Sequence, residues 1–247
     1  MPLSNNGLII PDWDAPEHIT AVCSTRHGGD STGPFSSLNL ATHVEDDAEL
    51  VRRNRQHFKQ RLGLSHQPQW LEQTHSTRVI DLDKDSNRNG DAAHTRKARR
   101  VAVVMTADCL PVLFTDAAGS EVAAAHAGWR GLLNGVLEQT VACMQSDPAA
   151  IMAWLGPAIG PRQFEVGAEV REQFVQQMAA AEACFEQNRG GHYLADLYAL
   201  ARLRLTKSGL TSISGGSYCT FTQAELFFSY RREKVTGRQA SLIYINK

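Results

Sequence analysis

A predicted hairpin brings a cysteine and a histidine together. Apolar runs at 112–115 and 121–125 flank a turn signal at 116–120, and this pattern predicts two antiparallel strands. Centring the turn on its glycine places Cys109 beside His126 at the open end of the hairpin. Backbones of antiparallel neighbours lie about 5 Å apart, so both side chains can reach one atom.

A cysteine beside a histidine allows three interpretations. The pair can be part of a buried core, it can be a nucleophile with its base, or it can supply two metal ligands. A third ligand favours the metal, and His75 is the best candidate because it follows a short strand in the polar segment 73–76. Two histidines and one cysteine leave a fourth tetrahedral position open, as in catalytic zinc sites.

The segment after His126 has the features of an anion-binding turn. A glycine-bracketed stretch, Ala127 to Gly131, separates the predicted strand from an amphipathic segment at 131–146. Free amide groups at a helix N-terminus bind anions, and Arg130 adds a guanidinium suited to phosphate or carboxylate. The alternative is that the glycines serve chain geometry alone.

The pattern of the remaining chain predicts one mixed α/β or α+β domain spanning residues 1–247. The expected strands lie at 19–25, 69–71, 101–105, 112–115, 121–125, 151–155 and 241–245. The expected helices lie at 46–62, 131–146, 167–187 and 194–208. Residues 27–34 are expected to form a loop, and the polar stretch 83–100 a long hairpin or exposed loop.

Composition and the absence of targeting signals argue against a nucleic-acid-binding, secreted or membrane-spanning protein. A net charge of −1 gives no electrostatic footprint for nucleic acid, and the basic run at 96–100 is interpreted as a solvated loop. The five cysteines are scattered without a C-x-x-C pair, which suits a reducing compartment. The N-terminus lacks the features of a signal peptide, and no stretch has the length of a membrane span. We therefore expect a cytoplasmic protein.

Five motifs closely resemble the YfiH-type family, also called the laccase-domain or polyphenol oxidase family. They are Trp70–His75 (WLEQTH), Thr106–Pro111 (TADCLP), His126–Gly131 (HAGWRG), Gly156–Gly160 (GPAIG) and Phe228–Arg232 (FSYRR). The resemblance extends from about residue 8 to residue 245. It implies an α+β fold with mixed β-sheets in an α/β/β/α layered arrangement, similar to that of the cytotoxic necrotizing factor toxins.

The resemblance also implies a set of site residues. The implied metal ligands are His75, Cys109 and His126. Cys109, His126 and Asp108 are the candidate catalytic residues, and Arg26, Asn39, Gln73 and Arg130 are the candidate substrate contacts. A role in loop structure is the alternative for Asn39, and capping of the Cys109 turn is the alternative for Asp108. The remaining histidines, His43 and His94 among them, are expected mostly on the surface.

The activities attached to the family differ, and the residues help to choose among them. Multicopper oxidases hold several coppers with many histidines, typically in H-x-H pairs, whereas this chain has nine histidines and no such pair. One thiolate with two imidazoles can hold one zinc or one copper ion, and we expect zinc. Laccase chemistry therefore ranks last.

The preferred hypothesis, carried by the resemblance, is a zinc-dependent purine nucleoside phosphorylase with adenosine deaminase activity. Its partners would be a purine nucleoside and inorganic phosphate, with the phosphate held by Arg26, Arg130 and the amides near Gly131. Asp108 or Glu72 would transfer protons. The alternative is a hydrolase that removes a misincorporated amino acid from a peptidoglycan precursor, and a third class is a non-catalytic metal-binding protein. The sequence does not predict the oligomeric state.

Overall fold

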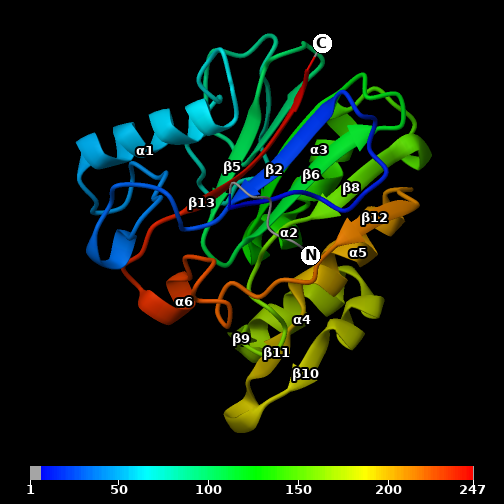
Figure 1. Cartoon of the computed structure of the whole chain (residues 1–247). Coiled ribbons are helices and arrows are strands. Elements are labelled where there is room, and N and C mark those ends of the chain that lie inside the picture. The colour runs from blue at the N-terminus through cyan, green and yellow to red at the C-terminus, as the bar shows by residue number, and fades with distance from the viewer. Residues whose placement is uncertain (1–6, 247) are drawn as a thin grey trace.

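Two β-sheets pack face to face, and helices cover the outer face of each (Figure 1). The computed structural model describes residues 7–246. Between the sheets, Leu113 and Trp154 from one sheet meet Val104 and Ile243 from the other. The expected α+β fold with α/β/β/α layers is confirmed.

The first sheet is antiparallel throughout and contains both ends of the described chain. In spatial order its strands are β1 (Leu8–Ile9), β2 (Ile19–Ser24), β13 (Gln239–Ile245) and β5 (Ala102–Thr106). Helix α1 (Ala48–Arg61) covers its outer face, where Phe58 packs against Val103 and Leu242. The helix begins at Asp47, whose carboxylate accepts hydrogen bonds from two amides of the first turn.

The second sheet has six strands and is mixed. In spatial order they are β12 (Ser212–Gly215), β8 (Ile151–Leu155), β6 (Leu110–Asp116), β7 (Val122–Ala127), β4 (Ala92–Thr95) and β3 (Val79–Asp81). The predicted hairpin is its centre, and the pairing of Pro111 with His126 brings Cys109 beside His126 as expected. Alternate residues of β6 face opposite layers: Val112 faces the helices and Leu113 faces the other sheet.

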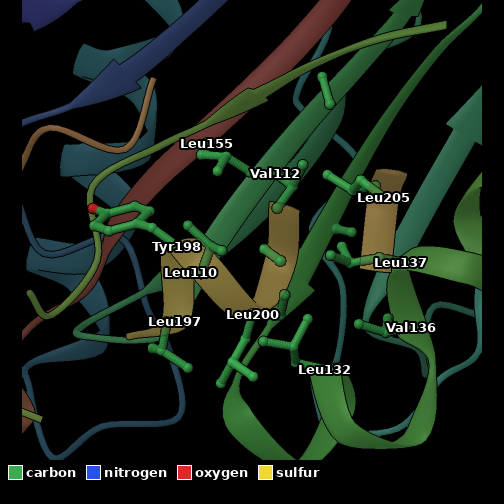
Figure 2. Close-up of a cluster of buried hydrophobic side chains, with 14 of the residues drawn as sticks. Leu110, Val112, Leu132, Val136, Leu137, Leu155, Leu197, Tyr198, Leu200 and Leu205 are labelled. Atoms are coloured by element: carbon green, nitrogen blue, oxygen red, sulfur yellow. The ribbon is translucent and has the colours of Figure 1, made fainter. Parts of the chain in front are cut away.

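Helices cover the free face of the six-stranded sheet. They are α2 (Trp129–Asn134), α3 (Val136–Cys143), α4 (Ala168–Gln177) and α5 (Leu197–Lys207). Figure 2 shows Leu137 and Leu205 meeting Val112 of β6 in this layer. The shorter helices are η1 (Gly33–Phe35), η2 (Pro148–Ala150), η3 (Ala179–Cys184), η4 (Arg189–Gly191) and α6 (Tyr230–Glu233). A small third sheet consists of β10 (Phe185–Gln187), β11 (Tyr193–Ala195) and β9 (Glu165–Val166), and with α4 it forms the lower edge of Figure 1.

Four predicted elements were wrong in extent or kind. The helix expected at 131–146 is two helices, because Gly135 adopts a φ of 98° between them. The helix expected at 167–187 ends at Gln177, and η3 and β10 follow. The stretch 83–100, expected to be a hairpin or exposed loop, contains the fully buried strand β4. The strand expected at 69–71 is reduced to an isolated bridge.

Within residues 7–246, no helix combines the length and the apolar character needed to cross a membrane.

Candidate metal centre and its cavity

Three loop and strand positions converge to form a possible metal site. Cys109 immediately precedes β6, His126 lies in β7, and His75 lies in the loop before β3, where its φ is 61°. Their ligand atoms all lie within 4.8 Å of one another, and Cys109 Sγ is 3.8 Å from His75 Nε2. The two imidazole rings meet edge to face, with centroids 4.8 Å apart. The structure thus brings together the three residues that the sequence selected.

A buried aspartate that the sequence analysis missed organises this group. Asp91 precedes β4 and is fully buried. One of its carboxylate oxygens accepts hydrogen bonds from His126 Nδ1 at 2.8 Å and from the His75 amide at 3.0 Å. The other oxygen accepts from the amides of Thr74 and Ser76 and from the Ser76 hydroxyl. The Nδ1 bond leaves His126 Nε2 to face Cys109, as is usual for metal-binding histidines.

The electrostatics of the group favour a cation. Burial opposes the Cys109 thiolate, but His126 and His75 outweigh it and lower the thiol pKa to about 6. Burial also opposes the His126 imidazolium, but Cys109 and Asp91 raise its pKa to about 9. The thiolate and the imidazolium thus stabilise each other, and a soft metal ion that replaces the imidazolium proton would find a ready ligand set.

Gly128 makes room for the group. A Cβ at this position would lie 2.8 Å from His75 Cδ2 and 3.0 Å from Cys109 Sγ. The absence of a side chain at the strand-to-helix turn lets both ligands approach the backbone. Together with the donor set and the carboxylate behind His126, this close packing fits a single bound metal ion.

The three ligands line a cavity of about 470 Å³ that is rich in arginine and aromatic side chains. Its other lining residues are His43, Gln73, Met105, Thr106, Ala107, Asp108, Trp129, Arg130, Ile159, Phe164, Tyr230, Arg231 and Arg238. Each arginine lies over an aromatic ring: Arg130 over Trp129, Arg231 over Phe164 and Arg238 over Tyr230. No carboxylate of residues 7–246 forms an ion pair with any of these three guanidinium groups. The cavity can therefore accept an anionic group.

The predicted substrate contacts separate into two groups. Gln73 and Arg130 line the cavity, although the Gln73 amide is held by hydrogen bonds to both backbone groups of Met105. Arg26 and Asn39 do not line it. The Arg26 guanidinium binds Ser36, Ala224 and Glu233.

Asn39 is fully buried, and its side chain supports the surrounding loops. Its amide nitrogen donates to Asp46, and its carbonyl oxygen accepts from the Arg238 and Ala41 amides. These contacts match the alternative role in loop structure that the sequence left open.

The two candidate proton-transfer residues also differ in position. Asp108 lines the cavity, but its carboxylate accepts hydrogen bonds from the Thr220 hydroxyl and the Arg231 amide, each at 2.6 Å. Its φ of 92° places it at the tight turn between β5 and β6. Glu72 is exposed and lies outside the cavity lining. Asp108 thus holds distant segments together beside Cys109.

Of the histidines expected mostly on the surface, His43 is exposed as expected, whereas His94 is buried. His43 lines the cavity, and burial, Arg238 and Arg55 lower its pKa. His94 is buried in β4 and bonds to Glu121 at 2.9 Å. The polar sequence around His43 gave no signal of a cavity. The buried strand around His94 was hidden because Ala92 and Ala93 are too small to give a clear apolar pattern.

The layered fold and the one-cysteine, two-histidine centre define a class of α+β protein with a candidate metal site, the one such site among residues 7–246. Residues 20–246 match the family model described as multi-copper polyphenol oxidoreductase laccase. The chain belongs to this laccase-domain family, which includes the YfiH proteins.

Bacterial relatives resemble the chain over nearly its whole length. It is 52% identical over 240 residues to the purine nucleoside phosphorylase YfiH of Escherichia coli, covering 96% of this chain and 98% of the relative. It is 50% identical over 239 residues to a purine nucleoside phosphorylase of Haemophilus influenzae, with 96% and 98% covered. The crystal structure of protein NMB0706 from Neisseria meningitidis superposes with a TM-score of 0.94 at 47% identity, covering 98% of this chain and all of that one.

Proposed function

We propose that this chain is a zinc-dependent purine nucleoside phosphorylase that also deaminates adenosine. The names of the relatives support the phosphorylase activity. The observation that carries the proposal is that one cavity holds both the His75, Cys109 and His126 group and three guanidinium groups without a carboxylate partner. Such a cavity suits a neutral nucleoside together with a phosphate anion.

The lining residues of the cavity suit both substrates. Arg130 follows directly after the strand-to-helix turn, so its guanidinium and the first amides of α2 can bind phosphate oxygens. The rings of Trp129, Phe164 and Tyr230 offer apolar surface for a purine. A phosphate oxygen would then form a bond to ribose C1′ while the bond from C1′ to the purine nitrogen breaks.

A bound zinc ion would supply a Lewis acid at the histidine–cysteine group. The purine must leave with a proton, and deamination also needs proton transfer to the departing ammonia. His43 is the cavity residue best suited to this work, because burial and the Arg238 and Arg55 guanidinium groups lower its pKa and so favour the neutral imidazole, which can accept a proton. Asp108 is less suited because both of its oxygens already accept hydrogen bonds.

The residues also support the choice of a single zinc over several coppers. The histidine–cysteine group is the one set of three potential ligands found among residues 7–246. A multicopper oxidase needs further ligands for its other coppers. One thiolate and two imidazoles suit one zinc ion with an open position for substrate.

We further propose that the chain forms one catalytic domain and is located in the cytoplasm. The single-domain proposal is supported by β13, which comes from the end of the chain and lies between β2 and β5. The location is supported by the five cysteines, all of which are free thiols.

The test is a product analysis of purified, zinc-loaded protein with adenosine or inosine, in the presence and absence of phosphate. We expect adenine or hypoxanthine with ribose 1-phosphate only when phosphate is present, and inosine from adenosine without it. Cys109→Ala should abolish both activities. A lack of turnover on nucleosides, together with amino-acid release from a muramyl peptide precursor, would establish the alternative hydrolase instead.

A further inference from the structure

We propose that Asp91 is a positioning residue that sets both the geometry and the ring tautomer of the metal centre. The inference rests on the metal site of the proposed function, but it does not depend on which reaction the site catalyses. Asp91 does not itself line the cavity, so its effect must act through His75 and His126, which do.

The carboxylate is the point at which the two histidine-bearing segments meet. Five donors converge on its two oxygens, and three of them are successive backbone amides, those of Thr74, His75 and Ser76. These three bonds fix the loop in which His75 adopts its positive φ. The Asp91 carbonyl oxygen also accepts the His126 amide at 2.7 Å. One residue therefore holds both the backbone and the ring of His126 and the loop of His75.

The bond to Nδ1 decides which nitrogen of His126 can bind a metal. An ionised carboxylate only accepts hydrogen bonds, so Nδ1 must carry the proton whenever the ring is neutral. Nε2 then has its lone pair free and directed toward Cys109. A second-shell carboxylate fixes the ligand tautomer in the same way at many zinc sites.

Asp91→Asn would keep the shape of the side chain but would replace one of its two acceptor oxygens with an NH₂ group, which donates hydrogen bonds. Its single oxygen can serve one side of the former carboxylate, and its NH₂ group must face donors on the other side. On the side facing His75 and His126 the NH₂ group would meet one backbone amide, that of His75, whereas on the other side it would meet two. A neutral His126 imidazole can then accept at Nδ1 by moving its proton to Nε2. Asp91→Asn thus favours the tautomer that cannot ligate a metal through Nε2.

The same pair of strands supplies a matched control. His94 of β4 and Glu121, which precedes β7, form a second buried histidine–carboxylate pair at 2.9 Å. Glu121 also accepts the amides of Gln145 and Ser146, so it too receives several donors. It lies at the opposite end of the β4–β7 ladder from His126. Glu121→Gln should therefore cost stability without changing the metal centre.

The experiment compares Asp91→Asn with Glu121→Gln in the full chain. Zinc affinity is measured by competition with a chromophoric chelator, and stability is measured by thermal denaturation of the metal-free proteins. We expect Asp91→Asn to weaken zinc binding by about 10–100-fold. We expect Glu121→Gln to leave zinc affinity within about twofold of the unmodified protein, because the sites are distant. The proposal is overturned if Asp91→Asn binds zinc as tightly as the unmodified protein. It is also overturned if Asp91→Asn and Glu121→Gln lose zinc affinity equally.

A second measurement needs no variant and covers the case in which Asp91→Asn does not fold. Nitrogen-15 NMR of the zinc-loaded, unmodified protein should show His126 protonated at Nδ1 and bound to the metal through Nε2. Binding through Nδ1 would overturn the proposal. A protein that shows the expected tautomer but no phosphorylase activity would leave this inference standing and reject the proposed reaction.

Discussion

At the scale of single residues, Arg130 is the cation best placed to bind phosphate. Its guanidinium lies 4.4 Å from the Trp129 ring centroid and makes no hydrogen bond to any residue of 7–246, so it is free for a ligand. A charge-assisted hydrogen bond contributes about 1.5–3 kcal/mol, so Arg130→Ala should raise the KM for phosphate by about 10–100-fold. Initial rates at varied phosphate and saturating inosine measure this effect.

Arg171 provides the matched control for Arg130. It also lies over an aromatic ring, that of Tyr193, but it pairs with Glu182 and lies outside the cavity lining. Arg171→Ala should leave the KM for phosphate unchanged. A similar rise in both variants would show that Arg130 does not contact phosphate.

Gly128 gives a steric prediction for the metal centre. A methyl group there would overlap His75 and Cys109, and neither ligand can retreat without leaving the other. Gly128→Ala should therefore reduce the zinc content of the purified protein to a small fraction of one ion per chain. Gly131→Ala is the control, because its Cβ would make contacts of 3.4 Å or longer and its position is helical. Full zinc occupancy in Gly128→Ala would contradict the assigned centre.

The sequence found some of these residues and missed others for a physical reason. Cys109 and His126 follow from hairpin register, which is local and periodic. His75 needed the family resemblance, because its loop joins the others only through tertiary contacts. Asp91 gave no signal, since a single aspartate after a glycine resembles an ordinary turn. Its role depends on hydrogen-bond donors that lie 15 to 35 residues away in the sequence, and no local sequence pattern predicts such contacts.

At the scale of elements, the β4–β7 pair gives a prediction about acid stability. Burial disfavours the Glu121 carboxylate, but the hydrogen bonds from His94 and Ser146 outweigh it and lower its pKa from 4.5 to about 2. A lowered folded-state pKa stabilises the fold above pH 4.5, and this contribution is lost as the pH falls from about 4.5 toward 2. The expected contribution at neutral pH is about 3 kcal/mol.

Urea denaturation of the metal-free protein tests this contribution. The unfolding free energy of Glu121→Gln should lie below that of the unmodified protein at pH 7, and the gap should shrink as the pH approaches 3. A gap that stays constant between these pH values would mean that the ionised carboxylate contributes nothing.

Elements that are determined by contiguous residues were predicted well, and elements that depend on distant neighbours were not. The β6–β7 hairpin was predicted to its register because the turn and both apolar runs are contiguous. The break at Gly135 was missed, because the apolar spacing continues across it and only the backbone shows the left-handed residue. Strand β4 was missed because its burial comes from neighbours on both sides and not from its own composition.

At the scale of the whole molecule, the site lies where both main sheets contribute a loop. The turn from β5 to β6 carries Cys109 from one sheet to the other, and Asp108 in that turn accepts the Arg231 amide of α6. In Figure 1, α6 and β9 lie below the ends of these sheets. A metal ion that joins His75, Cys109 and His126 would therefore link segments from several parts of the chain.

This linkage predicts that zinc stabilises the entire fold. A ligand that binds only the folded state at 100 times its dissociation constant adds about 2.7 kcal/mol. For a chain of this size, that corresponds to a rise in Tm of about 5–10 °C. Differential scanning calorimetry with and without zinc should show this rise in the unmodified protein and not in Cys109→Ala.

Cys143→Ala is the control, because it removes an exposed thiol outside the cavity lining, and it should keep the full rise in Tm. If Cys109→Ala gains as much stability as the unmodified protein, zinc binds elsewhere and the three residues do not form the metal centre.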